Sequence, residues 1–361
     1  MPETEIDDGN QETSISETSQ PGNNDRDQRI EYLQQRLTLG SLLPKTRRAA
    51  ATDPVDKVFA LLNISTTGEL DIIDYNKNLA GAYLDAAFSW QRPVELLDHV
   101  NLCAMDNETN KLPFWLPNWY RARGSMESLL DVGEGRAGIG VEPPGWFPGS
   151  IFRCDKYVAL IVMGVKVLTV TGVGPINIPD VIGDVPEGRN HAEMMSQFED
   201  PYPTTEKSYL ECYKSVIEPC AEDYQCSEMI RRGTLWDHKE NIAPNPDALK
   251  LSISSRYTEE QLIKSLPVQH WNKHFYTRDR PSTNRLFFVT KEGFMGLGSD
   301  GIESGDSICA FFGGRLLYIV RPIESSTEAF WFMGNCYIYG LMNGEVFHGY
   351  PKDQVQKILL A

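Results

Sequence analysis

Several features that would point to an obvious function are missing from this 361-residue sequence. No two of its seven cysteines form a Cys-x-x-Cys pair, and no secretory apolar segment follows Met1. Reduced thiols in the cytosol or nucleus fit this pattern, and we predict a cytoplasmic protein. The longest apolar run, from Tyr157 to Val170, is interrupted by Gly164 and Lys166 and is shorter than the roughly 20 residues that a membrane helix needs. The sequence therefore predicts no membrane partner.

Basic residues are also scarce. Lys and Arg number 34 against 50 Asp and Glu, which gives a formal net charge of -16. Such a surface repels phosphates, so we expect no nucleic-acid partner. Residues 1–29 carry eight acidic side chains against Arg26 and Arg29 and almost no large apolar ones. A segment of this composition cannot offset the entropy of ordering, so we predict a disordered acidic tail at residues 1–29.

No complete catalytic, metal-binding or nucleotide-binding motif is present. The glycines at 293–301 lack the Lys-Ser or Lys-Thr of a phosphate loop, which favours a hairpin turn. His270 and His274 have the spacing of two zinc ligands on a helix, but the glutamate of the HExxH motif is missing, so a zinc site is the weaker interpretation. Structural thiols are favoured over metal ligands for Cys212, Cys220 and Cys226. We therefore predict no catalytic residue, no cofactor and no metal.

What is present is the pattern of an α+β protein. Apolar residues recur at helical spacing in the segments 30–44, 54–62, 76–90, 206–218 and 258–266, and in the segment after Pro93. Residues 156–171 are β-branched and indicate one bent strand or a pair of strands. We assign residues 30–284 to a mainly helical α+β region with Trp- and Pro-rich loops.

Beyond Arg285 the character changes to short apolar runs bounded by Gly, Asp, Asn or Pro. Regular short strands of this kind predict a small antiparallel β-barrel or sandwich. Its last residues, 353–360, place Val355, Ile358 and Leu359 on one helical face, which predicts a closing helix. We assign residues 285–361 to this small β domain.

Two groups of residues are candidates for a structural role. Asp53, Asp56 and Lys57 open the best-specified helix, where Asp53 has the position of a cap and Asp56 that of a first-turn acid. Asp306 and Arg321 stand at predicted strand ends, where polar residues often pair across a barrel and fix its register.

Three tryptophans are candidates for a contact surface. Trp115, Trp119 and Trp146 lie in the loop-rich stretch, and we consider them as an interaction surface for a protein partner. The alternative is that they are buried against the edge of a core, which is the more common fate of such residues.

The helix opening at residues 52–62 (TDPVDKVFALL) resembles the DPRDKVYALLGL signature of fungal heterokaryon-incompatibility proteins. Residues 112–119 (LPFWLPNW) resemble that family's LPSWVPDW. Residues 285–298 (RLFFVTKEGFMGLG) and 334–344 (GNCYIYGLMNG) are similar to its C-terminal block. The resemblance extends over residues 45–350 as an ordered set, although Asn335 and Tyr339 replace the usual Glu and His.

In that family, the DPRDK signature follows an incompatibility domain with a YxxLSYxWG-like stretch, similar to folds whose catalytic relatives hydrolyse NAD. Nothing in residues 1–52 resembles that stretch, so the resemblance implies a truncated, non-enzymatic protein that acts in non-self recognition or regulation through protein contacts. Two alternatives stay open. One is an enzyme or small-molecule site in a cleft between the helical region and the β domain, and the other is a degenerate or truncated gene product.

Overall fold

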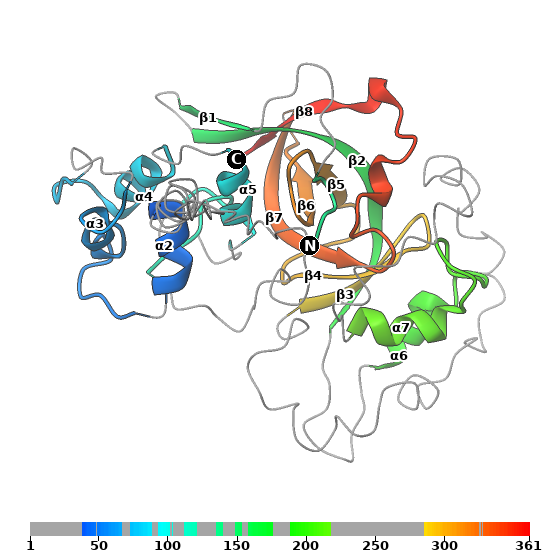
Figure 1. Cartoon of the computed structure of the whole chain (residues 1–361). Coiled ribbons are helices and arrows are strands. Elements are labelled where there is room, and N and C mark those ends of the chain that lie inside the picture. The colour runs from blue at the N-terminus through cyan, green and yellow to red at the C-terminus, as the bar shows by residue number, and fades with distance from the viewer. Residues whose placement is uncertain are drawn as a thin grey trace, which may run out of the picture.

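The computed structural model describes residues 38–47, 49–66, 73–88, 93–101, 103, 112–120, 135–139, 149–153, 158–175, 188–217, 285–324, 326 and 328–361 (Figure 1). The predicted acidic tail at 1–29 and the predicted helix at 258–266 lie outside these residues. His270, His274 and Trp146 lie outside them as well.

Helices form the first part of the described chain, as predicted. They are α2 (Leu39–Thr46), α3 (Asp56–Leu62), α4 (Leu79–Phe88), α5 (Pro93–Val100), α6 (Gly188–Met195) and α7 (Tyr209–Ile217). Helix α2 extends beyond the predicted segment 30–44, because it continues through Pro44 to Thr46. Thr38 caps its first turn by accepting a hydrogen bond from the Ser41 N–H at 3.2 Å, and only two helical residues follow Pro44. A proline so close to the end of a helix removes little of its hydrogen bonding.

The second part is an eight-stranded sheet. Its strands are β1 (Ser150–Arg153), β2 (Val158–Pro175), β3 (Arg285–Thr290), β4 (Met295–Ser299), β5 (Ser307–Phe311), β6 (Leu317–Pro322), β7 (Ala329–Ile338) and β8 (Gln356–Leu360). Antiparallel pairing joins β2, β3, β4, β7, β6 and β5 in that order, and β5 pairs with β2 again. The six strands thus form a closed ring of hydrogen-bonded neighbours, and the predicted arrangement of helices followed by an antiparallel sheet is confirmed.

Strand β2 is the element that completes the ring. Its first residues pair with β1 and β8, its middle with β5 and its last residues with β3. The register shifts between Lys166 and Leu168 and again between Val170 and Gly172, and such bulges bend a strand and increase its twist. Figure 1 shows β2 as one long strand that curves across the other strands. The sheet therefore includes two strands from outside residues 285–361.

Two apolar cores lie on the two faces of these strands. Along β6, Leu317 and Ile319 belong to one core, whereas Tyr318 and Val320 belong to the other. This alternation follows from the two-residue period of a strand. The second core also contains the buried side chains of α2–α5, which lie to one side of the ring in Figure 1, and α6 and α7 pack on the first core beside β3 and β4.

The predicted closing helix at residues 353–360 is wrong. Residues Lys352–Gln354 form a single turn of 3-10 helix, η8, and β8 follows. Strand β8 runs antiparallel to β2 and parallel to β7. Ile358 and Leu360 are buried and Leu359 between them is not, so the true period is two. In so short an apolar segment, periodicity does not distinguish a helix from a strand. The segment forms a strand because β2 and β7 offer edges with which it pairs.

Candidate functional site

The best-defined polar site lies at one end of the ring, where β6 ends and where β5 and β7 begin. Arg321, near the end of β6, donates from Nε to Oδ1 of Asp306 at 2.7 Å and from Nη2 to Oδ2 at 2.9 Å. Asp306, the residue before β5, is almost completely buried, whereas the Arg321 side chain is 29% exposed. The structure thus joins the two residues that the sequence placed at predicted strand ends, in the bidentate geometry that guanidinium and carboxylate favour.

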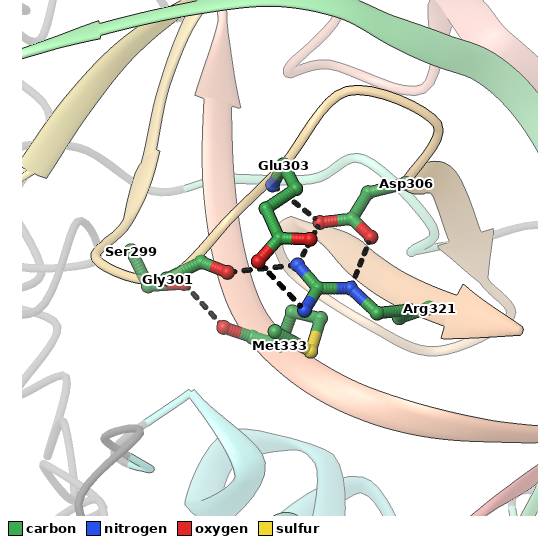
Figure 2. Close-up of polar contacts among 6 residues, drawn as sticks. All are labelled: Ser299, Gly301, Glu303, Asp306, Arg321 and Met333. Atoms are coloured by element: carbon green, nitrogen blue, oxygen red, sulfur yellow. Dashed lines mark hydrogen bonds and ion pairs between the residues drawn. The ribbon is translucent and has the colours of Figure 1, made fainter. Parts of the chain in front are cut away.

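The loop from β4 to β5 closes around the same guanidinium (Figure 2). Arg321 donates from Nη2 to the Gly301 carbonyl at 2.8 Å, and its Nη1 lies 3.3 Å from Oε1 of Glu303. Oδ2 of Asp306 also accepts from the Glu303 backbone N–H at 2.8 Å. The hydrogen bond with Asp306 raises the pKa of Arg321, so the guanidinium stays charged. One cation therefore fixes the loop, and Glu303 lies 70% exposed at its outer side.

An exposed tryptophan stands next to this cation. Trp331 on β7 is the direct cross-strand partner of Arg321, so both side chains leave the same face of the sheet. Its indole is 41% exposed. Phe114, from the loop at 112–119, packs against it edge to face with ring centroids 5.6 Å apart. We call Gly301, Glu303, Asp306, Arg321 and Trp331 together the ring-end site.

Two segments of the sequence that contain residues of the ring-end site are acidic. Residues 300–306 and 321–328 contain five carboxylates and one basic side chain, Arg321. The exposed carboxylates are those of Asp300, Glu303, Glu324 and Glu328. Because Arg321 is held by Asp306, these two segments leave four exposed carboxylates on the same strand ends as Trp331.

Two of the three tryptophans considered as an interaction surface are buried. Trp115 is completely buried and Trp119 is 1% exposed, both in the core shared by the helices and the ring. Trp119 is in contact with the His99 ring, edge to face at 5.2 Å, and with the Arg47 guanidinium, 5.8 Å from its ring centroid. The interaction-surface hypothesis is therefore wrong for both, because their large apolar area covers the edge of a core. Trp146 lies outside the described residues.

Asp53, Asp56 and Lys57 hold the start of α3. The Asp53 carboxylate accepts from the Val55 N–H at 3.1 Å, and α3 begins only at Asp56. Oδ1 of Asp56 accepts from the Tyr75 hydroxyl at 2.8 Å. The Lys57 ammonium donates to the carbonyls of Arg47 and Ala49, and burial together with the nearby Arg47 charge lowers its pKa. These contacts fix the loop after α2.

The junction between the helices and the ring is a packed core in the described part of the chain. A polar connection also crosses it. Asn335 on β7 donates from Nδ2 to the Asn101 carbonyl at 2.8 Å and accepts from Arg285 at 3.2 Å. Asn335 replaces the Glu that is usual in the family that the sequence resembles, and it connects the helices to the ring of strands.

Several buried thiols and one buried imidazole are held in their neutral forms. Burial raises the pKa of the Cys103 and Cys336 thiols and raises that of Cys212 to about 12. Burial lowers the pKa of His99 to about 3. Thiols held protonated are poor nucleophiles. In the part of the chain that the structure describes, no group of three His, Cys, Asp or Glu side chains is placed to hold a metal ion, and no helix there is long and apolar enough to cross a membrane.

Sequence reasoning missed two residues. Trp331 lies between Phe330 and Phe332, which are both buried, so the two-residue period of the run AFWFMG already placed it on the opposite face. Glu345, in the 3-10 helix η7 (Glu345–Phe347), is completely buried. The sequence did not indicate this burial, because a single acidic residue in a short apolar segment has no pattern that marks it as buried.

Two comparisons with known proteins point to the same kind of protein. Residues 254–355 match the family described as the Het-6 beta-barrel domain. Heterokaryon incompatibility protein 6, OR allele, of Neurospora crassa is 27% identical over 112 residues, which are 30% of this chain and only 16% of that relative. No solved structure matches the chain. Residues 254–355 are therefore similar to the β-barrel domain found in fungal heterokaryon incompatibility proteins.

Proposed function

We propose that this chain is a non-enzymatic protein of fungal heterokaryon incompatibility that acts in the cytoplasm, in recognition or regulation, through contact with another protein. The ring of strands serves as a small barrel that presents the contact surface. The relation to a heterokaryon incompatibility protein supports the biological setting. The observation that carries the contact role is the half-exposed Trp331, fixed by Phe114 on one side and beside the anchored Arg321 on the other.

A rigid, half-exposed tryptophan is the side chain most often found at the energetic centre of a protein interface. Three elements hold Trp331 in place: β7 carries it, the cross-strand Arg321 is locked by Asp306, and Phe114 packs against the ring edge. Little side-chain entropy is therefore lost when a partner covers it. The non-enzymatic part of the proposal is supported by the thiols and the imidazole that burial keeps neutral.

The contact role is tested by affinity purification of the tagged chain from a fungal lysate, followed by mass spectrometry. Trp331→Ala is compared with Phe88→Ala, because Phe88 on α4 is also an exposed aromatic, with 45% of its surface accessible. We expect a partner that the wild type and Phe88→Ala retain and Trp331→Ala loses. Identical partners for all three proteins would count against the ring-end site as the contact surface.

The non-enzymatic part is tested separately with purified protein and NAD. We expect no release of nicotinamide above a buffer control. Turnover that scales with protein concentration and survives repurification would contradict this part of the proposal and leave the contact role to the first experiment.

A further inference from the structure

The charge pattern around Trp331 says what kind of partner fits the ring-end site, and this step rests on the proposed contact role. The indole is 41% exposed, and the two chain segments beside it carry five carboxylates against one guanidinium. Asp306 already holds that guanidinium in two hydrogen bonds. Glu303, Glu324, Glu328 and Asp300 are exposed to solvent. An aromatic face surrounded by acids attracts cations and repels other acidic surfaces.

We infer that the ring-end site binds a basic segment of a partner protein, with an Arg or Lys side chain lying against the Trp331 indole. Both the ring quadrupole of tryptophan and the surrounding carboxylates favour a cation at this place. Arginine is preferred over lysine because its planar guanidinium stacks on an indole and also pairs with a carboxylate such as that of Glu303.

Other occupants fit less well. A second copy of this chain would bring the same acidic rim against itself, and like charges at close range oppose association. An acidic segment meets the same repulsion. Arg321 cannot attract an acidic partner strongly, because Asp306 and Glu303 already surround its guanidinium.

The test measures fluorescence anisotropy with the folded full chain and a labelled peptide of alternating Arg and Gly. Peptides with Lys, Gln or Glu in place of Arg are the comparison. We expect the Arg peptide to bind most tightly, the Lys peptide more weakly, and the Gln and Glu peptides not at all. Binding should weaken as ionic strength rises and the Debye length falls.

Matched variants then separate this site from the general attraction of an acidic protein for a basic peptide. Trp331→Leu should weaken binding about tenfold, as loss of a central interface aromatic does, whereas Phe88→Leu should leave it unchanged. The double variant Glu324→Gln with Glu328→Gln should weaken binding, whereas Glu193→Gln with Glu199→Gln, two exposed acids of the α6 region, should have little effect. Urea unfolding confirms that every variant is folded.

Four outcomes would overturn the inference. Equal weakening by both acid pairs would mean attraction by net charge alone. Unchanged binding by Trp331→Leu would remove the indole from the site. Self-association in sedimentation velocity that Trp331→Leu abolishes would assign the surface to a second copy. If the Arg peptide does not bind but a lysate partner still depends on Trp331, only the basic character of the partner is wrong and the contact role stands.

Discussion

Arg321 and Asp306 join β6 to the start of β5 through two parallel hydrogen bonds, although one of the two side chains is buried and the other is partly open to water. The pair is placed beside Trp331, so the group that fixes this end of the ring also fixes the surroundings of the exposed indole. The Arg321–Asp306 pair therefore contributes both to the stability of the ring and to the position of the proposed contact surface.

Removing the acid of this pair should destabilise the fold. Asp306→Ala leaves the Arg321 guanidinium without its bidentate partner and frees the β4–β5 loop, and we expect the free energy of unfolding to fall by about 2 kcal/mol. The partial exposure of Arg321 keeps the value below that of a fully buried pair. Guanidinium chloride unfolding measures it. Asp300→Ala, an exposed acid in the same loop, is the control, and an equal loss in both variants would show that the pair contributes nothing specific.

Glu345 should make stability depend on pH. Oε2 of its buried carboxyl accepts from the Asn343 N–H at 2.6 Å, and Oε1 has no hydrogen-bond partner among the described residues. Burial raises the pKa of Glu345 from 4.5 to about 7. Between these two pH values the folded protein keeps a proton on Glu345 that the unfolded chain releases. The contribution of Glu345 to the free energy of unfolding is therefore complete below pH 4.5 and is lost as the pH rises to 7. The fall amounts to about 3 kcal/mol.

Glu345→Gln removes this titration. We expect the variant to lose less stability than the wild type between pH 5 and pH 7.5, as measured by urea unfolding at each pH. Glu328→Gln, at an exposed position, should follow the wild type. Parallel pH profiles for Glu345→Gln and the wild type would mean that Glu345 is ionised throughout.

Substitution by alanine should cost much more stability at Trp115 than at Trp331. Trp115→Ala removes a completely buried indole and should lower the free energy of unfolding by about 3–5 kcal/mol. Trp331→Ala removes a partly exposed one and should cost less than about 1 kcal/mol. Thermal unfolding of both variants checks this, and a large loss for Trp331→Ala with a small one for Trp115→Ala would contradict the burial described here.

The sequence predicted element types well where a segment was long and periodic. The α3 segment was correctly predicted as a helix, but its start was not: Asp53 and Pro54 were expected to open it, whereas α3 begins at Asp56 after Val55, without a side-chain cap. The strands after Arg285 are separated by turn residues, so local signals sufficed there. β8 was missed because its apolar residues fit both periods and only the edges of β2 and β7 select the strand. Local patterns do not show which edges lie open.

The site was only partly predictable, for a related reason. Asp306 and Arg321 stand beside predicted strand ends, and their sequence positions led directly to an expected structural role. The burial of Trp115 depends on the core that it shares with Tyr318 and other ring residues, which lie far along the chain. The exposure of Trp331 depends on which face of β7 meets that core. Neither follows from composition, which treats all tryptophans alike.

The part of the chain that matches a known family should not fold by itself. A fragment of residues 254–361 lacks β2, which pairs with β3, β5 and β8. Without it the ring is open between β3 and β5, and β8 keeps only two register pairs with β7. The buried aromatics Phe311 and Tyr318 also lose the helical side of their core.

We expect this fragment to aggregate and to show no cooperative unfolding by circular dichroism, since exposed strand edges and apolar surface favour association. A fragment of residues 149–361 contains β1 and β2 and serves as the comparison. It should unfold cooperatively, although less stably than the full chain, because it still lacks α2–α5. A cooperative transition in the 254–361 fragment, at the midpoint of the longer one, would mean that β2 covers a finished sheet and does not complete it.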